Sequence, residues 1–187
     1  MPAVRPSLTA KPASPPAVER ILAIDSALRK TGWAILEKST AARDLRTIGY
    51  GVITNHPKLL PSGCLVAIRE QLTAIIGQHA PTVCAIESTI YVQSFKTAIA
   101  LGTARGAALI AAAEQGLPIY EYSPREVKQA AVGRGAAQKE QVAFMIRSLL
   151  RLKETPPPDA ADALAVAIAH FQSCDASQII SREAKRI

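Results

Sequence analysis

The sequence predicts a single α/β domain built on a five-stranded mixed sheet, with three antiparallel strands leading into parallel ones and helices on both faces. Three observations carry this prediction. Three short apolar segments follow one another closely near the N-terminus, which favours an antiparallel meander. Two later apolar runs are separated by a long helical segment, the pattern of a parallel βαβ unit. The 187 residues are 49% hydrophobic, which suits one domain with a full core.

The meander occupies the first part of the domain. Strands are expected at Ile21–Asp25, Gly32–Glu37 and Arg46–Thr54, because these segments are short and rich in β-branched or aromatic residues. The polar segment Lys38–Asp44 separates the second strand from the third. Residues 1–20 contain five prolines and are expected to form a flexible tail. The domain then spans residues 21–172, and residues 173–187 are expected to form a second flexible tail.

The βαβ unit follows the meander. Leu59–His79 shows the apolar period of a helix, and Thr82–Glu87 is the nearly continuous apolar run expected of a strand buried on both faces. Phe95–Gln115 is a helix in which ten of 21 residues are Ala or Gly, and it leads to the strand Leu117–Tyr122. This composition predicts burial on more than one side. Its two glycines, four residues apart, are expected to pack tightly on the sheet, with one helix face left for a second subunit.

Three helices are expected in the C-terminal third of the chain. Pro124–Ala131 begins with a proline, which is favoured in the first turn of a helix. Gln138–Leu152 is amphipathic, and Gly133–Gly135 before it is expected to form a basic, flexible loop. The last helix, Asp159–Phe171, follows three consecutive prolines.

The charge and cysteine content narrow the class of protein. The net charge of +7 favours a polyanionic partner, with nucleic acid as the first candidate. The three cysteines (Cys64, Cys84 and Cys174) are odd in number and form no CxxC pair, which indicates reduced thiols in an intracellular protein rather than disulfides or a zinc site. The three histidines lie far apart in the sequence and are expected to be structural. No segment reaches the ~18 uninterrupted apolar residues of a membrane span.

Four carboxylates form the candidate site. Asp25 and Glu87 each end an apolar strand, and adjacent parallel strands would place them side by side. Asp159 and Asp162 are three residues apart and share one helix face. Four carboxylates in one place cannot all ionise without cations, and oxygen-only ligands indicate Mg²⁺ or Mn²⁺. Two such ions would support hydrolysis of a phosphodiester.

Structural explanations remain open for each acid. Asp25 and Glu87 could be strand-end residues that face water. Asp159 after the prolines could be an N-cap, with Asp162 imitating a capping box.

Basic residues supply the expected contacts to nucleic acid. Between Arg125 and Lys153 there are seven basic residues against two acidic ones. Lys128 and Lys139 bracket the predicted loop and are the candidates for reaching the reacting phosphate, where a cation would stabilise developing charge. The other cationic candidates are Arg29, Lys30, Arg105, Arg125 and Arg134. The alternative for any one of them is a solvated helix face.

Together, the segments ILAID…TGW, AIEST…ALGTARGAALIAAAEQGLPIYEYSPREVKQAAVGRGAAQKEQV and PDAADALAVAIAH resemble the RuvC family, between about Ile21 and His170. These are bacterial Holliday-junction resolvases (crossover junction endodeoxyribonucleases) of the ribonuclease H-like superfamily. The resemblance implies a ribonuclease H-like fold and a homodimer that resolves four-way DNA junctions by paired, Mg²⁺-dependent nicks during recombination and repair. It also implies a cytoplasmic, nucleoid-associated protein that works with the branch-migration helicase complex of RuvA and RuvB.

The same resemblance places family roles on residues of this chain. The catalytic and metal-binding acids fall on Asp25, Glu87, Asp159 and Asp162, and the active-site lysines fall on Lys128 and Lys139. The helix Phe95–Gln115 is implied to help form the dimer interface.

This chain departs from the family pattern at two points. Asp25-Ser26-Ala27 stands where the family usually has Asp-Pro-Gly, so the turn after the first acid is expected to differ in shape. Ile90 stands where the family has an aromatic residue that meets DNA bases, and the neighbouring Tyr91 is the candidate to replace it, since stacking needs only a π-face.

Three rival functions remain at this level. One is another ribonuclease H-like nuclease, which would act on RNA or on a different branched DNA. A second is a sugar-kinase-like ATPase, although that fold needs two such domains and this chain is short. The third is a non-catalytic module that binds junctions.

Overall fold

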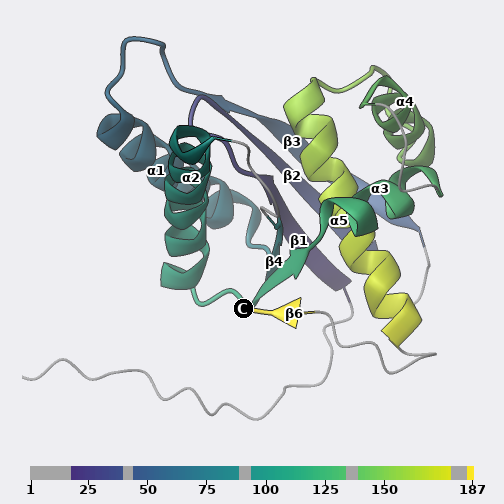
Figure 1. Ribbon diagram of the computed structural model, residues 1–187. Coiled ribbons are helices and arrows are strands. Elements are labelled where there is room, and N and C mark those ends of the chain that lie inside the picture. Colours follow the sequence, from purple (N-terminus) through teal and green to yellow (C-terminus); the bar gives the residue numbers. More distant parts are fainter. Residues whose placement is uncertain (1–17, 40–43, 89–93, 134–138, 178–184) are drawn as a thin grey trace, which may run out of the picture.

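The computed structural model describes residues 18–39, 44–88, 94–133, 139–177 and 185–187. Its centre is one mixed sheet in the order β3-β2-β1-β4-β5-β6 (Figure 1). The strands are β1 (Val18–Asp25), β2 (Lys30–Ser39), β3 (Leu45–Thr54), β4 (Val83–Glu87), β5 (Ile119–Tyr122) and β6 (Lys185–Arg186). The helices are α1 (Pro61–His79), α2 (Phe95–Glu114), α3 (Pro124–Val132), α4 (Lys139–Leu149) and α5 (Pro158–Ser177).

The strand pairing confirms the predicted sheet. β1, β2 and β3 form the antiparallel meander, while β4 lies parallel to β1, and β5 lies parallel to β4. The two-residue strand β6 was not expected, because the sequence analysis assigned this part of the chain to a flexible tail. It pairs antiparallel with β5 and adds a sixth strand at that edge.

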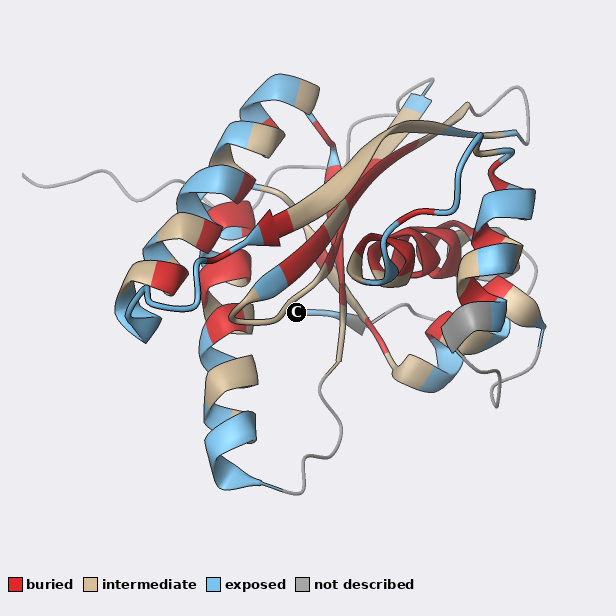
Figure 2. Cartoon of the chain, turned by 90° about the horizontal axis from the view of Figure 1, so that it is seen from above, coloured by how far each residue is buried: buried red, intermediate tan, exposed pale blue. Residues whose placement is uncertain are grey.

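Each face of the sheet has its own helical cover and its own core. The α2 face, covered by α1 and α2, buries Leu22, Ile24, Ile35, Cys84 and Ile86. The α5 face, covered by α3, α4 and α5, buries Ile21, Ala23, Ala34, Leu36, Val83 and Ala85. Helix α5 is enclosed almost all round, as its buried residues show in Figure 2. An alanine-rich helix suits this position, because small side chains let it lie close to the strands.

The glycines of α2 do not pack on the sheet, so that expectation is wrong. A Cβ atom added at Gly102 or Gly106 would meet nothing within 4 Å. The close approach to the sheet is instead made by buried alanines, namely Ala104, Ala107, Ala108, Ala111 and Ala112. Alanine suits this role better than glycine because it combines small size with high helix propensity.

The last helix differs from its prediction at both ends. α5 begins at Pro158, so Asp159 lies within its first turn and is not the N-cap. The helix also continues past Phe171 to Ser177. In the part of the chain that the structure describes, no helix combines the length and hydropathy needed to cross a membrane.

Candidate active site

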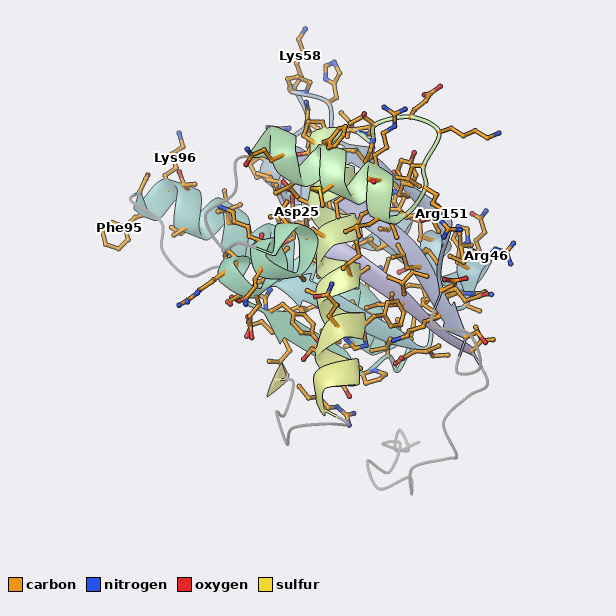
Figure 3. All side chains as sticks on the ribbon, turned by 90° about the vertical axis from the view of Figure 1, so that its right-hand side faces the viewer. Asp25, Arg46, Lys58, Phe95, Lys96 and Arg151 are labelled. Carbon is orange, nitrogen blue, oxygen red and sulfur yellow. The ribbon has the colours of Figure 1, made fainter. Side chains whose placement is uncertain are left out.

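Asp25 and Glu87 stand at adjacent strand ends on the same face of the sheet. The parallel register of β1 and β4 pairs Ile24 with Ile86, so the two acids are the next residues along neighbouring strands. Side chains alternate between the two faces of a strand. In both strands the odd-numbered core residues lie on the α5 face, and the two acids continue that alternation. Both are partly buried, and Asp25 lies beside α5 in Figure 3.

The start of α5, which carries Asp159 and Asp162, lies against the strand that pairs with Asp25. Asp25 is the cross-strand partner of Gly32 in β2. A Cβ atom built on Gly32 would lie only 1.9 Å from the main-chain oxygen of Asp159. The absence of a side chain at Gly32 therefore lets the first turn of α5 sit directly on the strand opposite Asp25. Asp162 follows Asp159 on the same helix face, and both are partly buried.

The four acids thus come from three elements that meet at one end of the α5 face. All four acids are predicted from the sequence, whereas Gly32, which allows α5 to approach the strand, is not among the predicted site residues. A glycine inside an apolar strand, directly opposite a candidate acid, was the available signal, because such glycines often mark a close backbone approach.

The turn between β1 and β2 is held by two buried polar residues. The Thr31 hydroxyl donates to the main-chain carbonyl of Ala27 at 2.7 Å. The Asn55 side-chain amide donates to the carbonyl of Leu28 at 2.8 Å, and its backbone amide donates to the carbonyl of Arg29 at 2.9 Å. These contacts fix the backbone of the turn that follows Asp25.

Arg105 of α2 supports the end of β4 from the other face. Its Nη1 donates to the main-chain carbonyl of Glu87 at 2.7 Å, and its Nη2 forms an ion pair with Glu121 Oε1 at 2.7 Å. Both charged side chains are about 15% exposed. Arg105 therefore positions the backbone of a candidate catalytic residue, and its guanidinium is engaged inside the protein.

The thiol of Cys84, in β4, is buried in the core on the α2 face. Burial raises the pKa of Cys84 to about 12, and the nearby Arg105 only partly offsets this. A thiol with such a pKa stays protonated at neutral pH and is a poor nucleophile.

The predicted DNA-contacting residues fall into three groups. Lys30, Arg125 and Lys128 are exposed or partly exposed. Arg29, like Arg105, is engaged internally: its Nη1 donates to the main-chain carbonyls of His56 and Leu59 at 2.8 and 2.9 Å. Tyr91, Arg134 and the side chain of Lys139 lie outside the described residues.

Helix α3, which carries Lys128, begins directly after the strand that lies next to Glu87. β5 ends at Tyr122, the register partner of Glu87, and α3 begins two residues later. A capping box fixes this start: the Ser123 hydroxyl accepts from the backbone amide of Glu126, whose carboxylate accepts from the backbone amide of Ser123. Lys128 therefore lies on a helix whose start is fixed directly after β5, the strand next to Glu87.

A cavity of about 490 Å³ lies elsewhere, between the start of β3 and the end of α4. Its lining includes Arg46, Arg151 and Lys153. Figure 3 shows Arg46 and Arg151 on the opposite side of α5 from Asp25. This basic cavity is therefore separate from the four acids.

Comparison with known proteins identifies the family. Residues 21–170 match the family model described as crossover junction endodeoxyribonuclease RuvC, a segment that includes all four acids. The chain belongs to the RuvC family. A RuvC from Akkermansia muciniphila is 51% identical over 168 residues, covering 90% of this chain and 99% of the relative. One from Klebsiella pneumoniae is 43% identical over 162 residues, covering 87% and 90%.

Solved structures agree with this RuvC assignment. The RuvC of T. thermophilus, determined in complex with a Holliday junction substrate, has a TM-score of 0.79 and 31% identity, covering 90% of this chain and 99% of that one. The yeast mitochondrial Holliday junction resolvase shares the fold, with a TM-score of 0.60 and 13% identity over 82% of this chain and 78% of that one. The predicted ribonuclease H-like fold is confirmed.

Family membership also decides between the functions that the sequence left open. The expectation of a crossover junction endodeoxyribonuclease, acting in recombination and repair, is confirmed. This chain matches a RuvC endonuclease over nearly the full length of both proteins. Three alternatives are therefore excluded: a nuclease of another family, a sugar-kinase-like ATPase and a non-catalytic module.

Proposed function

We propose that this RuvC resolves four-way DNA junctions with Asp25, Glu87, Asp159 and Asp162 as its catalytic residues and as the ligands of two Mg²⁺ ions. The observation that carries the proposal is the meeting of β1, β4 and the first turn of α5 on one face of the sheet. Each element delivers carboxylates there, and none of the four acids lies in the fully buried core.

The residues present fit Mg²⁺. The donor set consists of carboxylates alone, which suits a hard cation and not zinc. The close seating of the Asp159 main chain on Gly32 holds the first turn of α5 against the strand that pairs with Asp25. When bound, Mg²⁺ would lower the pKa of a water nucleophile and neutralise charge on the leaving oxygen. The protein's own part is to hold the four carboxylates on a rigid strand and helix framework.

Lys30, Arg125 and Lys128, which are at least partly exposed, are proposed to bind backbone phosphates, because the other described candidates, Arg29 and Arg105, are held by internal hydrogen bonds. Lys128, with Lys139 at the start of α4, is proposed to approach the reacting phosphate. Tyr91 is proposed to stack on a base. Arg29 and Arg105 are proposed to act indirectly, by holding the turn after β1 and the end of β4.

The test compares a labelled four-way junction with linear duplex DNA and an RNA–DNA hybrid, each with Mg²⁺ or with EDTA. Paired nicks in the junction alone, lost with EDTA, are expected. Asp25→Asn and Glu87→Gln should abolish cleavage and retain junction binding, whereas Glu70→Gln, on the exposed surface of α1, should cleave normally. A cleaving Asp25→Asn variant would remove the basis of the proposed site.

A homodimer is proposed to form through α2. Its outer face carries a stripe with Phe95 91% exposed, Ile99 66% exposed and Ile110 51% exposed, and Gly102 and Gly106 lie open between them. These positions are three or four residues apart and so share one side of the helix. Figure 3 shows Phe95 projecting away from the rest of the molecule. Water-facing aromatic and aliphatic side chains in one stripe indicate a surface that is covered by a partner.

Two active sites related by a dimer axis would nick two opposed strands of one junction. Phe95→Glu is expected to give monomers in analytical ultracentrifugation, whereas Phe144→Glu, at an exposed phenylalanine of α4, should leave the mass unchanged. A dimeric Phe95→Glu would refute the assignment of the interface to α2.

In the cytoplasm, RuvA and RuvB are the proposed helicase partners.

A further inference from the structure

Three metal-ligating side chains meet at the end of α5 that lies away from the acids. Glu19 comes from the start of β1, while His170 and Cys174 lie one turn apart on α5. His170 Nε2 lies 3.6 Å from Cys174 Sγ and 3.6 Å from Glu19 Oε1. One ligand atom from each residue lies within 4.8 Å of the other two. The alternation of β1 places Glu19 on the α5 face, as it does Asp25.

One hydrogen bond from His170 Nε2 cannot engage both of the groups that face it. The other ring nitrogen, His170 Nδ1, already lies 2.8 Å from the Tyr122 hydroxyl. Nε2 therefore faces the Glu19 carboxylate and the Cys174 thiol at equal distances of 3.6 Å, a length that is ordinary for a hydrogen bond to sulfur and long for one to oxygen. A single ring nitrogen can offer only one proton or one lone pair. A cation placed between the three atoms would satisfy all of them at once.

We propose that Glu19, His170 and Cys174 bind a zinc ion, with water as the fourth ligand. A tetrahedral ion with bonds of about 2.0 Å to nitrogen and about 2.3 Å to sulfur separates those two ligand atoms by about 3.5 Å. The observed 3.6 Å matches that separation. Imidazole, thiolate and carboxylate together form a set typical of Zn²⁺, in contrast to the oxygen-only set at the four acids.

The surroundings suit a metal-bound histidine. A ligating imidazole usually donates its second N–H to a fixed acceptor, and the Tyr122 hydroxyl occupies that position. Burial raises the pKa of Tyr122, so its phenol stays neutral, and its hydroxyl also hydrogen-bonds to Ser173. His170 is 1% exposed, whereas the Glu19 side chain is 37% exposed, so the ion could enter from the Glu19 side. Neither cysteine counting nor the spacing of the histidines revealed this cluster, and it revises the expectation that the chain has no zinc site.

The ion would clamp the same two elements that carry the catalytic acids. Six residues of strand separate Glu19 from Asp25, which corresponds to about 20 Å. Eight residues of helix separate His170 from Asp162, about 12 Å. Zinc at one end and the carboxylates at the other would thus fix α5 against β1 along its length. The clamp is independent of the proposed cleavage mechanism.

The test uses the full chain, stripped of metal by a chelator and then titrated with Co²⁺ as a spectroscopic substitute for Zn²⁺. Wild-type protein is expected to show a thiolate-to-cobalt charge-transfer band that saturates at one ion per chain and disappears when Zn²⁺ is added. Cys174→Ser should lose the band, and Cys64→Ser and Asp25→Asn should retain it. These controls exclude another cysteine and the acid site as the source.

Zinc affinity gives a second readout. Zn²⁺ should raise the melting temperature of the wild type but not that of Cys174→Ser or Glu19→Gln; Glu19 is partly exposed, so its variant is expected to fold. Tyr122→Phe, which removes only the acceptor behind His170, should weaken zinc binding about 10- to 100-fold. A wild-type protein without the thiolate band, or a Cys174→Ser variant that keeps it, would overturn the proposal.

Discussion

Replacing Gly32 with alanine should impair cleavage without touching a catalytic group. The new Cβ atom would lie 1.9 Å from the main-chain oxygen of Asp159 and 2.5 Å from its carbonyl carbon. Real Cβ contacts essentially never fall below 3.0 Å, so β2 and the first turn of α5 must separate by about 1.1 Å. The obstacle is main chain on both sides, and no side-chain rotation can relieve it.

A separation of that size moves Asp159 and Asp162 relative to Asp25. Misplacement by about 1 Å can cost about 100-fold in rate, and overpacking typically costs about 1–3 kcal/mol of stability. We expect the single-turnover rate of junction nicking to fall about 100-fold in Gly32→Ala, with junction affinity close to that of the wild type.

The matched control is Gly49→Ala in the neighbouring strand β3. A Cβ atom there would meet Trp33 at 3.6 Å, which is an ordinary van der Waals contact. This variant should nick at the wild-type rate and melt at nearly the wild-type temperature. If Gly32→Ala also nicks at the wild-type rate, or loses no more than Gly49→Ala, the seating of α5 on β2 does not control the site.

Three further predictions concern the supports of the site. Arg105→Met should destabilise the fold by about 2 kcal/mol in urea unfolding, because it removes the largely buried ion pair between Arg105 and Glu121; unchanged stability would contradict this role. In metal-free native protein, Cys84, with a pKa of about 12, should resist iodoacetamide at pH 8 while Cys174 reacts, and both should react in urea, as followed by mass spectrometry. Equal alkylation of Cys84 and Cys174 in the native protein would contradict the burial of the Cys84 thiol. Ser123→Ala should lower the free energy of unfolding by about 1 kcal/mol through loss of the capping box, and Ser123→Thr should restore most of it. If the wild type and Ser123→Ala have the same melting temperature, the cap contributes nothing to stability.

The local part of the site was predictable from the sequence. Asp25 and Glu87 end apolar strands, and the two-residue period of a strand is a local property that decides which face each side chain takes. The βαβ connection predicted that the fourth and fifth strands run parallel, and the close spacing of the first three predicted the meander. These inferences need only neighbouring residues and the handedness of crossovers.

The remainder depends on contacts between distant segments. Arg105 reads as a DNA-binding cation in sequence, yet its ion pair with Glu121 exists only because α2 packs across β4 and β5. In the sequence, the position of Asp159 after three prolines allows it to be interpreted as an N-cap. Proline is also favoured within the first helical turn, and α5 begins at Pro158, so Asp159 lies inside the helix. The meeting of Glu19 with His170 and Cys174 likewise requires β1 to lie under the far end of α5.

The turn held by Thr31 and Asn55 sets the alignment between β1 and β2, and this alignment has a chemical meaning. Asp25 faces α5 only while it pairs with Gly32. A slip of one residue would carry every side chain of the shifted strand to the opposite face of the sheet. It would also replace the glycine under Asp159 with a residue that has a Cβ atom. Thr31 and Asn55 therefore fix the register between β1 and β2. Substitutions of these two buried residues should reduce cleavage as substitutions in the active site do, although neither side chain contacts DNA.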